Sequence, residues 1–407
     1  SACIDESIGL LNTSVNAISY QWDFCNDGLG NGFEASPSGL EIAGINQPQE
    51  LEIKYDKGIW YGFVTSRLTN ELVRLDFGDS LFSNPVLTNM GNIDGRLNLP
   101  NALKLVYQGD MWYGFLINSG NGSLIRLNFG GSLSNVPSTE NLGNLDGWSD
   151  PRMLDYVTYL DQHYIIVTSA GNDKITVIDF GNSVNNSVGT IKTLVNPGGV
   201  IDIPVGISVL PMNGNWYGLV GTSTNKLYHF DFGSSLFNDP IISEISDLNQ
   251  PKELILVEDG GSFFGFIVAP KNLYRIQFEN DLTFTGSEVV EDLGNPFGLF
   301  DNLFGAALVV DGADWKLGLL NQNSNNMALL AFRDSCEYVN ISTSDEIEPT
   351  ISFTQSGVFS ISLVGESSNL NRERISKEIS ITPSTAPDIS FSISTNRCVS
   401  NPNTFTS

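Results

Sequence analysis

Basic residues are scarce in this chain of 407 residues, and their scarcity excludes two classes of partner. Only 20 lysines and arginines stand against 46 aspartates and glutamates, which gives a net charge of −26. A phosphate backbone or an anionic lipid surface would repel such a protein, so we expect neither nucleic acid nor a membrane as a partner. The acidic residues are dispersed, and we expect them to serve solubility; an acidic surface that collects Ca²⁺ is the alternative.

Long apolar runs are missing as well, since no stretch approaches the roughly 20 residues that a membrane-spanning helix needs. No signal peptide is present at Ser1, so we expect the sequence to begin after a targeting segment or within a longer protein. Little lysine, together with abundant Asn, Ser, Thr and Gly, is typical of an extracellular β-rich protein. We therefore predict an extracellular location without membrane insertion.

Residues that usually carry catalysis or bind metals are also few. The four cysteines are too few for a disulfide scaffold and lack the close C-x-x-C spacing of a zinc site. The two histidines, His163 and His229, lie in different repeats, and we expect both to be structural. No G-x-S-x-G, H-E-x-x-H or calcium-loop motif occurs, and neither does the S-x-D-x-G-x-T-W box of sialidases. We predict no enzyme, no catalytic residue and no cofactor, and leave Ca²⁺ open.

One nine-residue motif, which we call the FG phrase, by contrast occurs four times. VRLDFGDSL at 73–81 returns as IRLNFGGSL at 125–133, TVIDFGNSV at 176–184 and YHFDFGSSL at 228–236. Counted on the glycine of FG, the intervals are 52, 51 and 52 residues. In five copies a proline stands 12 residues before an aromatic residue or histidine, beginning with Pro48 and Trp60, and a sixth copy keeps only Trp315. The chain therefore contains six similar units.

Within each unit the hydrophobic period is two, which indicates strands rather than helices. Val73, Leu75 and Phe77 share one face, and polar residues share the other, as in a half-buried strand. Four strands in a repeat of about 50 residues predict the blade of a β-propeller. The sixth unit lacks its outer strand, but residues 32–48 resemble the fourth-strand region at 81–100. We predict that this N-terminal stretch completes the sixth blade and closes the ring.

Two other segments resemble a known family, the PKD domain. NAISYQWDFCNDG at 16–28 is similar to the Y-x-W-D-F-G-D-G strand and turn of that family, with Cys25 in place of the first glycine. EPTISFTQSGVFSISLVGE, which begins at Glu348, is similar to its P-x-H-x-Y-x-x-x-G-x-Y-x-V-x-L strand pair, with phenylalanine in place of tyrosine and no histidine. The resemblance implies a PKD-like or Ig-like β-sandwich, divided between the two ends of the chain.

The resulting fold prediction is an all-β protein in which a six-bladed β-propeller is inserted in a PKD-like sandwich. The segments are 1–25 for the first part of the sandwich, 26–335 for the propeller, 336–385 for the second part, and 386–407 for the start of a next sandwich. Insertion requires the chain to leave and return at nearly one point. Cys25 and Cys336 sit at those two points, so we predict a disulfide between them; two unpaired thiols are the alternative.

The last residues suggest a tandem array. NRCVSNPNTFTS at 396–407 parallels SACIDESIGLLNTS at 1–14, which places Cys398 one unit after Cys3, without deciding their partners. Arrays of PKD-like sandwiches with propellers resemble giant cell-surface proteins of Bacteroidota, including the SprB-type adhesins of gliding motility exported by the type IX secretion system. This resemblance implies a filamentous surface adhesin whose partners are neighbouring repeats.

The candidate binding residues lie in loops between one blade and the next. GNIDGRLNLP at 91–100, GNLDGWSDP at 143–151 and NPGGVIDIP at 196–204 are expected to cluster at one mouth of the ring. They carry the proposed ligand-binding residues Asp94, Arg96, Asp146, Trp148, Asp150 and Asp202. Trp148 stands among turn residues, and an exposed aromatic ring beside carboxylates suits carbohydrate binding. The alternative is a tryptophan packed in the loop beside solvated aspartates.

Three functions follow from these observations. The first is a non-enzymatic repeat of a secreted adhesin, with the propeller displayed on sandwiches and binding glycans or surface proteins. The second is a purely structural spacer in a surface fibre. The third is a propeller enzyme acting on polysaccharide, which the scarcity of histidine and the scattered carboxylates disfavour.

Overall fold

The computed structural model describes residues 2–15, 17–24, 28–30, 32–35, 39–42, 44–259, 261–278, 281–311, 314–332, 338–367, 372–383, 392–394 and 404–406. Their regular structure is β-strand, apart from four short 3-10 helices: η1 (Ile93–Gly95), η2 (Ala170–Asn172), η3 (Pro197–Gly199) and η4 (Pro296–Gly298). No described helix is long and apolar enough to cross a membrane.

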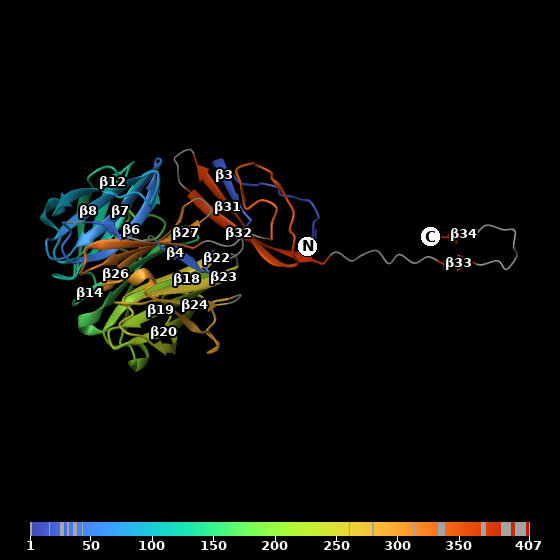
Figure 1. Ribbon diagram of the computed structural model, residues 1–407. Coiled ribbons are helices and arrows are strands. Elements are labelled where there is room, and N and C mark those ends of the chain that lie inside the picture. Colours follow the sequence, from blue (N-terminus) through green and yellow to red (C-terminus); the bar gives the residue numbers. More distant parts are fainter. Residues whose placement is uncertain are drawn as a thin grey trace, which may run out of the picture.

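Six antiparallel sheets follow one another along the chain, as predicted, and form the blades of a β-propeller (Figure 1). Blades 1 to 3 consist of β6 (Pro48–Asp56), β7 (Ile59–Ser66), β8 (Glu71–Gly78) and β9 (Val86–Gly91); β10 (Pro100–Gln108), β11 (Met111–Asn118), β12 (Leu124–Gly130) and β13 (Ser138–Gly143); and β14 (Pro151–Tyr159), β15 (Gln162–Ser169), β16 (Lys174–Asp179) and β17 (Ile191–Val195). Blades 4 to 6 consist of β18 (Pro204–Met212), β19 (Asn215–Thr222), β20 (Lys226–Gly233) and β21 (Ile241–Asp247); β22 (Glu253–Asp259), β23 (Ser262–Val268), β24 (Leu273–Phe278) and β25 (Val290–Gly294); and β26 (Leu303–Asp311), β27 (Asp314–Asn321) and β28 (Asn326–Phe332) with β4 (Phe33–Ala35) and β5 (Leu40–Glu41).

The first strand of every blade is the innermost. β6, β10, β14, β18, β22 and β26 contact one another in this order, and β26 returns to β6. These six strands surround the axis of the propeller. Their side chains therefore decide whether the axis is an open channel or a packed core.

Both faces of a typical blade are buried, which differs from the half-buried strand expected from the alternation. Val73 and Leu75 on one face of β8 pack against blade 6, and Leu72 on the other face packs against blade 2. Arg74 shares that second face and is also buried. The alternation thus separates two neighbouring blades rather than core from solvent, because every sheet except its edges lies between two others.

A repeated hydrogen bond joins each blade to the next. A cationic or imidazole side chain on the third strand donates to a main-chain carbonyl of a leucine or valine in the following blade. The pairs are Arg74 Nη1 with Leu133 O (3.3 Å), Arg126 Nη1 with Val184 O (2.9 Å), His229 Nε2 with Leu282 O (2.8 Å) and Arg275 Nη1 with Leu29 O (2.5 Å). We call these four bonds the inter-blade bonds.

The sixth blade is completed from the N-terminal side, as the sequence predicts. β4 pairs antiparallel with β28, with Phe33 opposite Phe332, and β5 pairs with the start of the same strand. Leu29 then takes the place that Leu133 has in blade 2, since its carbonyl accepts from Arg275 and its N–H donates to Asp259 (3.3 Å). The ring is closed by strand pairing and by an inter-blade bond together.

Strands from both ends of the chain form a second unit beside the propeller (Figure 1). The strands are β1 (Ala2–Cys3), β2 (Ile8–Gly9), β3 (Ala17–Asp23), β29 (Thr343–Ser344), β30 (Thr350–Ile351), β31 (Gly357–Ser367) and β32 (Arg372–Thr382). Five of them form one sheet in the order β1-β32-β31-β3-β29, and β2 pairs with β30. A separate hydrophobic cluster, which includes Trp22, Phe353 and Phe359, fills this unit, which we call the end sheet unit. Farther along, β33 (Ser392–Ser394) pairs with β34 (Thr404–Thr406).

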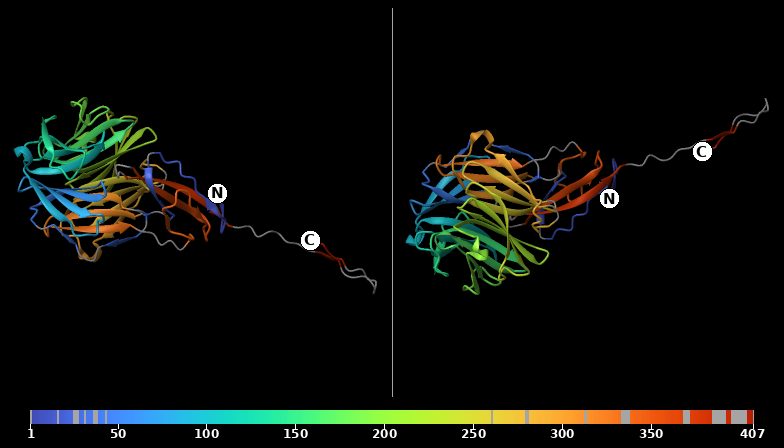
Figure 2. Two further views of the ribbon diagram at one scale, coloured as in Figure 1. Left: turned by 90° about the horizontal axis from the view of Figure 1, so that it is seen from above. Right: turned by 90° about the horizontal axis from the view of Figure 1, so that it is seen from below.

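The end sheet unit is attached at one edge of blade 6. Leu303 pairs with Asn321, which pairs with Asn326, so these three residues share one end of the blade. Phe332 pairs with Trp315 at the opposite end, and the chain continues from there into the end sheet unit. The end of the propeller at which the inner strands begin is therefore the end away from this unit, and the two further views show the N terminus beyond the end sheet unit (Figure 2).

Candidate functional site

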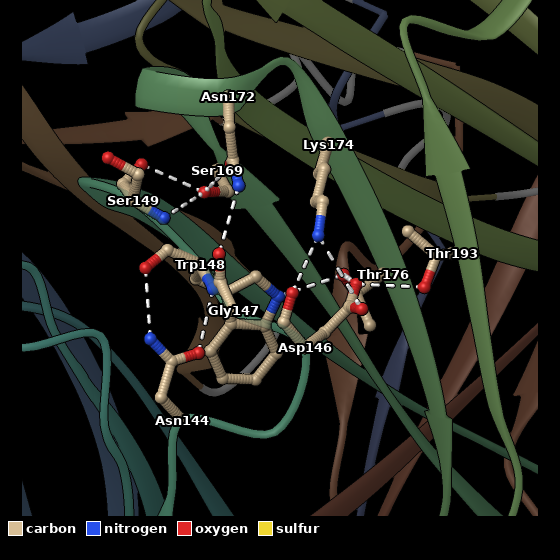
Figure 3. A network of polar contacts seen from close by, with 10 residues as sticks. All are labelled: Asn144, Asp146, Gly147, Trp148, Ser149, Ser169, Asn172, Lys174, Thr176 and Thr193. Atoms are coloured by element: carbon tan, nitrogen blue, oxygen red, sulfur yellow. Dashed lines mark hydrogen bonds and ion pairs between the residues drawn. The ribbon is translucent and has the colours of Figure 1, made fainter.

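Trp148 is not an exposed binding residue, and this expectation is wrong. Its side chain is 4% exposed and belongs to a hydrophobic cluster that runs through blades 2, 3 and 4. The indole Nε1 donates to Thr176 Oγ1 at 2.8 Å, and Asn144 clamps its main chain through Oδ1 (2.7 Å) and Nδ2 (2.9 Å) (Figure 3). The ring therefore closes the contact between two blades and has no free face for a sugar.

A repeated position explains why. Three residues before the Pro48 position of every blade stands a large apolar side chain that is buried: Ile45, Leu97, Trp148, Ile201, Leu248 and Phe300. Asn92 and Asn295 clamp the loops of Leu97 and Phe300 as Asn144 clamps that of Trp148. Counting back from the prolines would have revealed this plug in the sequence, whereas the polar neighbours of Trp148 concealed it.

Asp146 supports this contact between blades. Its carboxylate accepts from Thr176 Oγ1 (2.7 Å) and Thr193 Oγ1 (2.9 Å), while Lys174 Nζ donates to its main-chain carbonyl (2.7 Å) (Figure 3). Both hydroxyl groups donate to Oδ2, and Lys174 Nζ lies 3.7 Å from Oδ1, so this carboxylate is engaged by β16 and β17. Its role is to hold the loop at 143–151 on blade 3.

The other expected binding residues are dispersed. Asp94 accepts from the N–H and hydroxyl of Thr139 on the outer strand of blade 2, and the carbonyl of Arg96 accepts from Asn118. Asp150 pairs with Arg152, and Asp202 is exposed. No hydrogen bond or ion pair joins any two of Asp94, Arg96, Asp146, Trp148 and Asp202, all of which are described. The loops do lie at one end of the propeller, but the side chains of Asp94, Asp146 and Asp150 bond to partners other than one another.

The charged residues that do meet lie on the axis, and we call them the axial cluster: Glu50, Glu52, Lys104, Asp155 and Glu253. Four inner strands supply them, and Lys104 Nζ lies 3.4 Å from Glu50, 3.2 Å from Glu52 and 3.8 Å from Glu253. Glu50 and Glu253 are 0% and 1% exposed. Asp155 Oδ2 accepts from the N–H of Val209 at 2.7 Å. The axis at this level is filled rather than open.

Burial sets the protonation of the axial cluster. It raises the pKa of Glu253 to about 8 and that of Asp155 to about 6, because an ion loses its hydration there. The pKa of Glu50 is raised well above its ordinary value by burial and by the nearby Glu253. Burial also acts on Glu52, but Lys54 and Lys104 outweigh it and lower the pKa of that carboxyl. Near neutral pH, Glu52 and Asp155 are therefore ionised beside Lys54 and Lys104, Glu253 holds its proton, and burial favours the protonated form of Glu50.

A pocket of about 270 Å³ opens above this cluster, at the end where the inner strands begin. The first residue past the Pro48 position in each blade forms a ring there, and Arg152, Val205, Lys252 and Phe304 supply the four positions that line the pocket. Ile203, Ser223 and Gln250 complete the wall. We call this pocket the mouth pocket; sequence patterns did not identify it, because its residues come from four different repeats.

Positive charge gathers at the mouth pocket. Burial and the neighbouring Arg152 lower the pKa of Lys252 to about 8, and the same two causes lower the pKa of Arg67. Lys252 Nζ bonds the amide oxygen of Asn302 (3.0 Å) and lies 4.5 Å from the ring centre of Phe304. Arg152 has Asp150 as its carboxylate partner at 2.5 Å. Among the described residues Lys252 has no carboxylate partner.

Both histidines lie in contacts between blades. His163 takes the place of the repeated tryptophan, with Nδ1 2.6 Å from Tyr156 Oη and Nε2 2.7 Å from Gln108. His229 makes one of the inter-blade bonds, and burial lowers the pKa of both rings. These contacts agree with the structural role expected for both residues.

Neither the predicted disulfide nor a metal site can be placed in the structure. Cys25, Cys336 and Cys398 lie outside the described residues, and Cys3 is exposed with a free thiol. No group of three His, Cys, Asp or Glu residues suited to a metal ion occurs in the described part of the chain. The Cys25–Cys336 bond therefore stays a prediction.

Comparison with known proteins finds likeness in fold. No family model matches the sequence, and no curated protein matches it. Among solved structures, a thermostable family-43 glycoside hydrolase is 12% identical with a TM-score of 0.45, over 64% of this chain and 96% of that one. A Trypanosoma rangeli sialidase in complex with 2,3-difluorosialic acid is 10% identical with a TM-score of 0.49, over 74% and 59%. An α-L-arabinofuranosidase from Podospora anserina in complex with cellotriose is 11% identical with a TM-score of 0.42, over 78% and 98%. At these identities the similarity extends no further than the propeller fold.

Proposed function

We propose that this chain is a non-enzymatic display module of a secreted cell-surface adhesin, in which the propeller is carried on a PKD-like sandwich. One observation carries the proposal: β3, before the propeller, pairs with β31, after it, over the length of the strand. The end sheet unit thereby holds both ends of the propeller segment at one place. The opposite end of the propeller, with its mouth pocket, stays free to meet a partner.

The burial of the carboxyl groups on the propeller axis supports a binding module rather than a hydrolase. Acid–base catalysis by paired carboxyl groups requires that both come within hydrogen-bond reach of the substrate. Glu50 and Glu253 are closed off from solvent by the strands that carry them, and Lys104 holds the carboxylate of Glu52. A substrate entering the mouth pocket would meet cations and an aromatic ring first.

The resemblance of the end segments to PKD domains supports the wider setting. Modules of this kind would follow one another in a tandem array on the outer surface, with neighbouring repeats as partners and export by a type IX system. A bulky spacer without a ligand is the second candidate, and it is favoured by the many side chains that serve only contacts between blades, such as Trp148 and Asp146.

The test is retention of the full chain on panels of glycans, polysaccharides and cell envelopes, in Ca²⁺ and in EDTA, with assay of released reducing ends from the same samples. The proposal expects selective retention and no product. Retention on nothing would favour the spacer. Product release that disappears in a Glu253→Gln variant would establish an enzyme and contradict the proposal.

A further inference from the structure

The mouth pocket is built of unlike surfaces that converge on a small volume. Lys252 and Arg152 supply charge, Phe304 and Val205 supply apolar surface, and Gln250 supplies an amide. Its volume of about 270 Å³ lies just under the roughly 300–1,000 Å³ typical of small-molecule sites. Such a space admits one ring of a ligand rather than an extended chain.

The mouth pocket is positively charged, whereas the molecule as a whole is negatively charged. The chain as a whole carries −26, yet burial and then repulsion from Arg152 lower the pKa of both Lys252 and Arg67. Asp150 is the carboxylate paired with Arg152. The Nε of Arg67 is buried without a hydrogen-bond partner among the described residues, although its Nη2 donates to Ser119 Oγ at 3.3 Å. An added anion would relieve this repulsion.

The axial cluster below does not oppose an anion. Burial keeps Glu253 protonated near neutral pH and favours the protonated form of Glu50, while Lys54 and Lys104 balance the ionised Glu52 and Asp155. The floor of the mouth pocket is therefore close to neutral, while its wall is positive. In a partly buried site of this kind, charge-assisted hydrogen bonds are stronger than neutral ones.

We propose that the mouth pocket binds an acidic sugar unit, with its carboxylate or sulfate between Lys252 and Arg152 and its ring against Phe304 and Val205. Arg152 and Lys252 donate to the oxyanion, and Gln250 and Ser223 meet the hydroxyl groups at the rim. The inference deepens the proposed function and rests on it, since it gives the displayed propeller a ligand class. Carboxylated and sulfated polysaccharides share this chemistry, so experiment must separate them.

The test is calorimetric titration of the full chain with three probes: tetragalacturonate, a sulfated galactan tetrasaccharide without carboxylates, and neutral galactotetraose. We expect one charged probe to bind at least about tenfold more tightly than the neutral one. Which charged probe binds distinguishes the two sources of the oxyanion. Equal affinity for all three, or no heat from either charged probe at millimolar concentration, would overturn the proposal.

Variants locate the site. Lys252→Met and Arg152→Met should each weaken binding of the charged probe by about tenfold or more, and Lys252→Arg should retain most of it. Lys57→Asn is the matched control, because Lys57 is an exposed lysine in the β6–β7 turn at the other end of the propeller, with a positive φ that asparagine tolerates. Thermal unfolding checks each variant; if Lys252→Met does not fold, Arg152→Met decides, since its side chain is partly exposed.

The two proposals fail differently. Undiminished binding of the charged probe by Lys252→Met and Arg152→Met would overturn the site while leaving an adhesin. Retention of the chain on neutral glycans, without affinity for either charged probe, would overturn the acidic ligand and keep the proposed function. Hydrolysis of a probe would contradict the proposed function itself.

Discussion

At the scale of single residues, position within the repeat decides what a side chain does. A tryptophan ring such as that of Trp148 is able to stack on a sugar. Trp148, however, stands three residues before Pro151, and at this position all six blades have a buried apolar side chain. Lys252 has the chemistry of an ordinary solvated lysine, but it directly follows Pro251 and therefore faces the axis. Residue type alone therefore misplaced Trp148 and gave no reason to single out Lys252.

Trp148→Ala is predicted to destabilise the propeller by about 3–5 kcal/mol, because it opens a cavity between blades 2 and 3 and removes the bond to Thr176. Trp148→Phe should cost less, since it keeps most of the packing. Urea unfolding measures both, with Val136→Ala, at a side chain 64% exposed, as the control. Loss of ligand binding by Trp148→Ala at unchanged stability would contradict the burial of this ring.

The axial cluster predicts a pH dependence of stability. The pKa of Glu253 is about 8 in the folded chain, above the ordinary value near 4.3, so the folded state holds this proton more tightly than the unfolded state. The stabilisation is complete below the ordinary value and is lost as the pH rises through 8. Asp155, with a pKa of about 6, acts in the same direction. We expect the free energy of unfolding to fall by about 2 kcal/mol or more between about pH 5 and pH 8.

Glu253→Gln provides the comparison, because glutamine cannot titrate. Urea unfolding at several pH values should show a clearly smaller decline for this variant than for the parent chain. The same decline in both would mean that the axial glutamate is ionised and hydrated across the range.

At the scale of elements, the blades are held together by bonds that cross from one sheet to the next. The repeated FG phrase places a glycine with positive φ, as at Gly130 (67°), so that Leu133 can turn towards Arg74 of the preceding blade. The segment at 28–30 repeats this arrangement after a strand of a different unit, since Leu29 accepts from Arg275.

Arg275→Met is predicted to loosen the closure of the ring. It leaves the buried carbonyl of Leu29 without its cation, at a cost of about 1–3 kcal/mol, and the closing strand β4 should exchange its amide hydrogens faster. Arg126→Met removes the equivalent bond to Val184 within the ring and is the matched comparison. Faster exchange of β4 in the Arg126 variant and not in the Arg275 variant would contradict the assignment of Leu29 to the closure.

At the scale of the whole molecule, features that repeat along the sequence could be predicted, whereas sites formed by residues far apart in the sequence could not. Six units, their strand count and the completion of blade 6 by residues before Pro48 follow from phrases that recur at nearly constant spacing. The axial cluster and the mouth pocket do not, because their residues come from different blades. Glu50 and Glu253 share one repeat position in blades 1 and 5, and only ring closure brings both within 4 Å of Lys104 Nζ from blade 2. Patterns within one repeat carry no information about such meetings.

The most direct test of the account is a crystal structure of the full chain grown with the charged tetrasaccharide that it binds. The account predicts a sixth blade completed by β4, an end sheet unit made from both ends of the chain, and the acidic group of the sugar in contact with Lys252 and Arg152 at the opposite end of the propeller. A sugar bound along the end sheet unit, or an open sixth blade with β4 elsewhere, would contradict it.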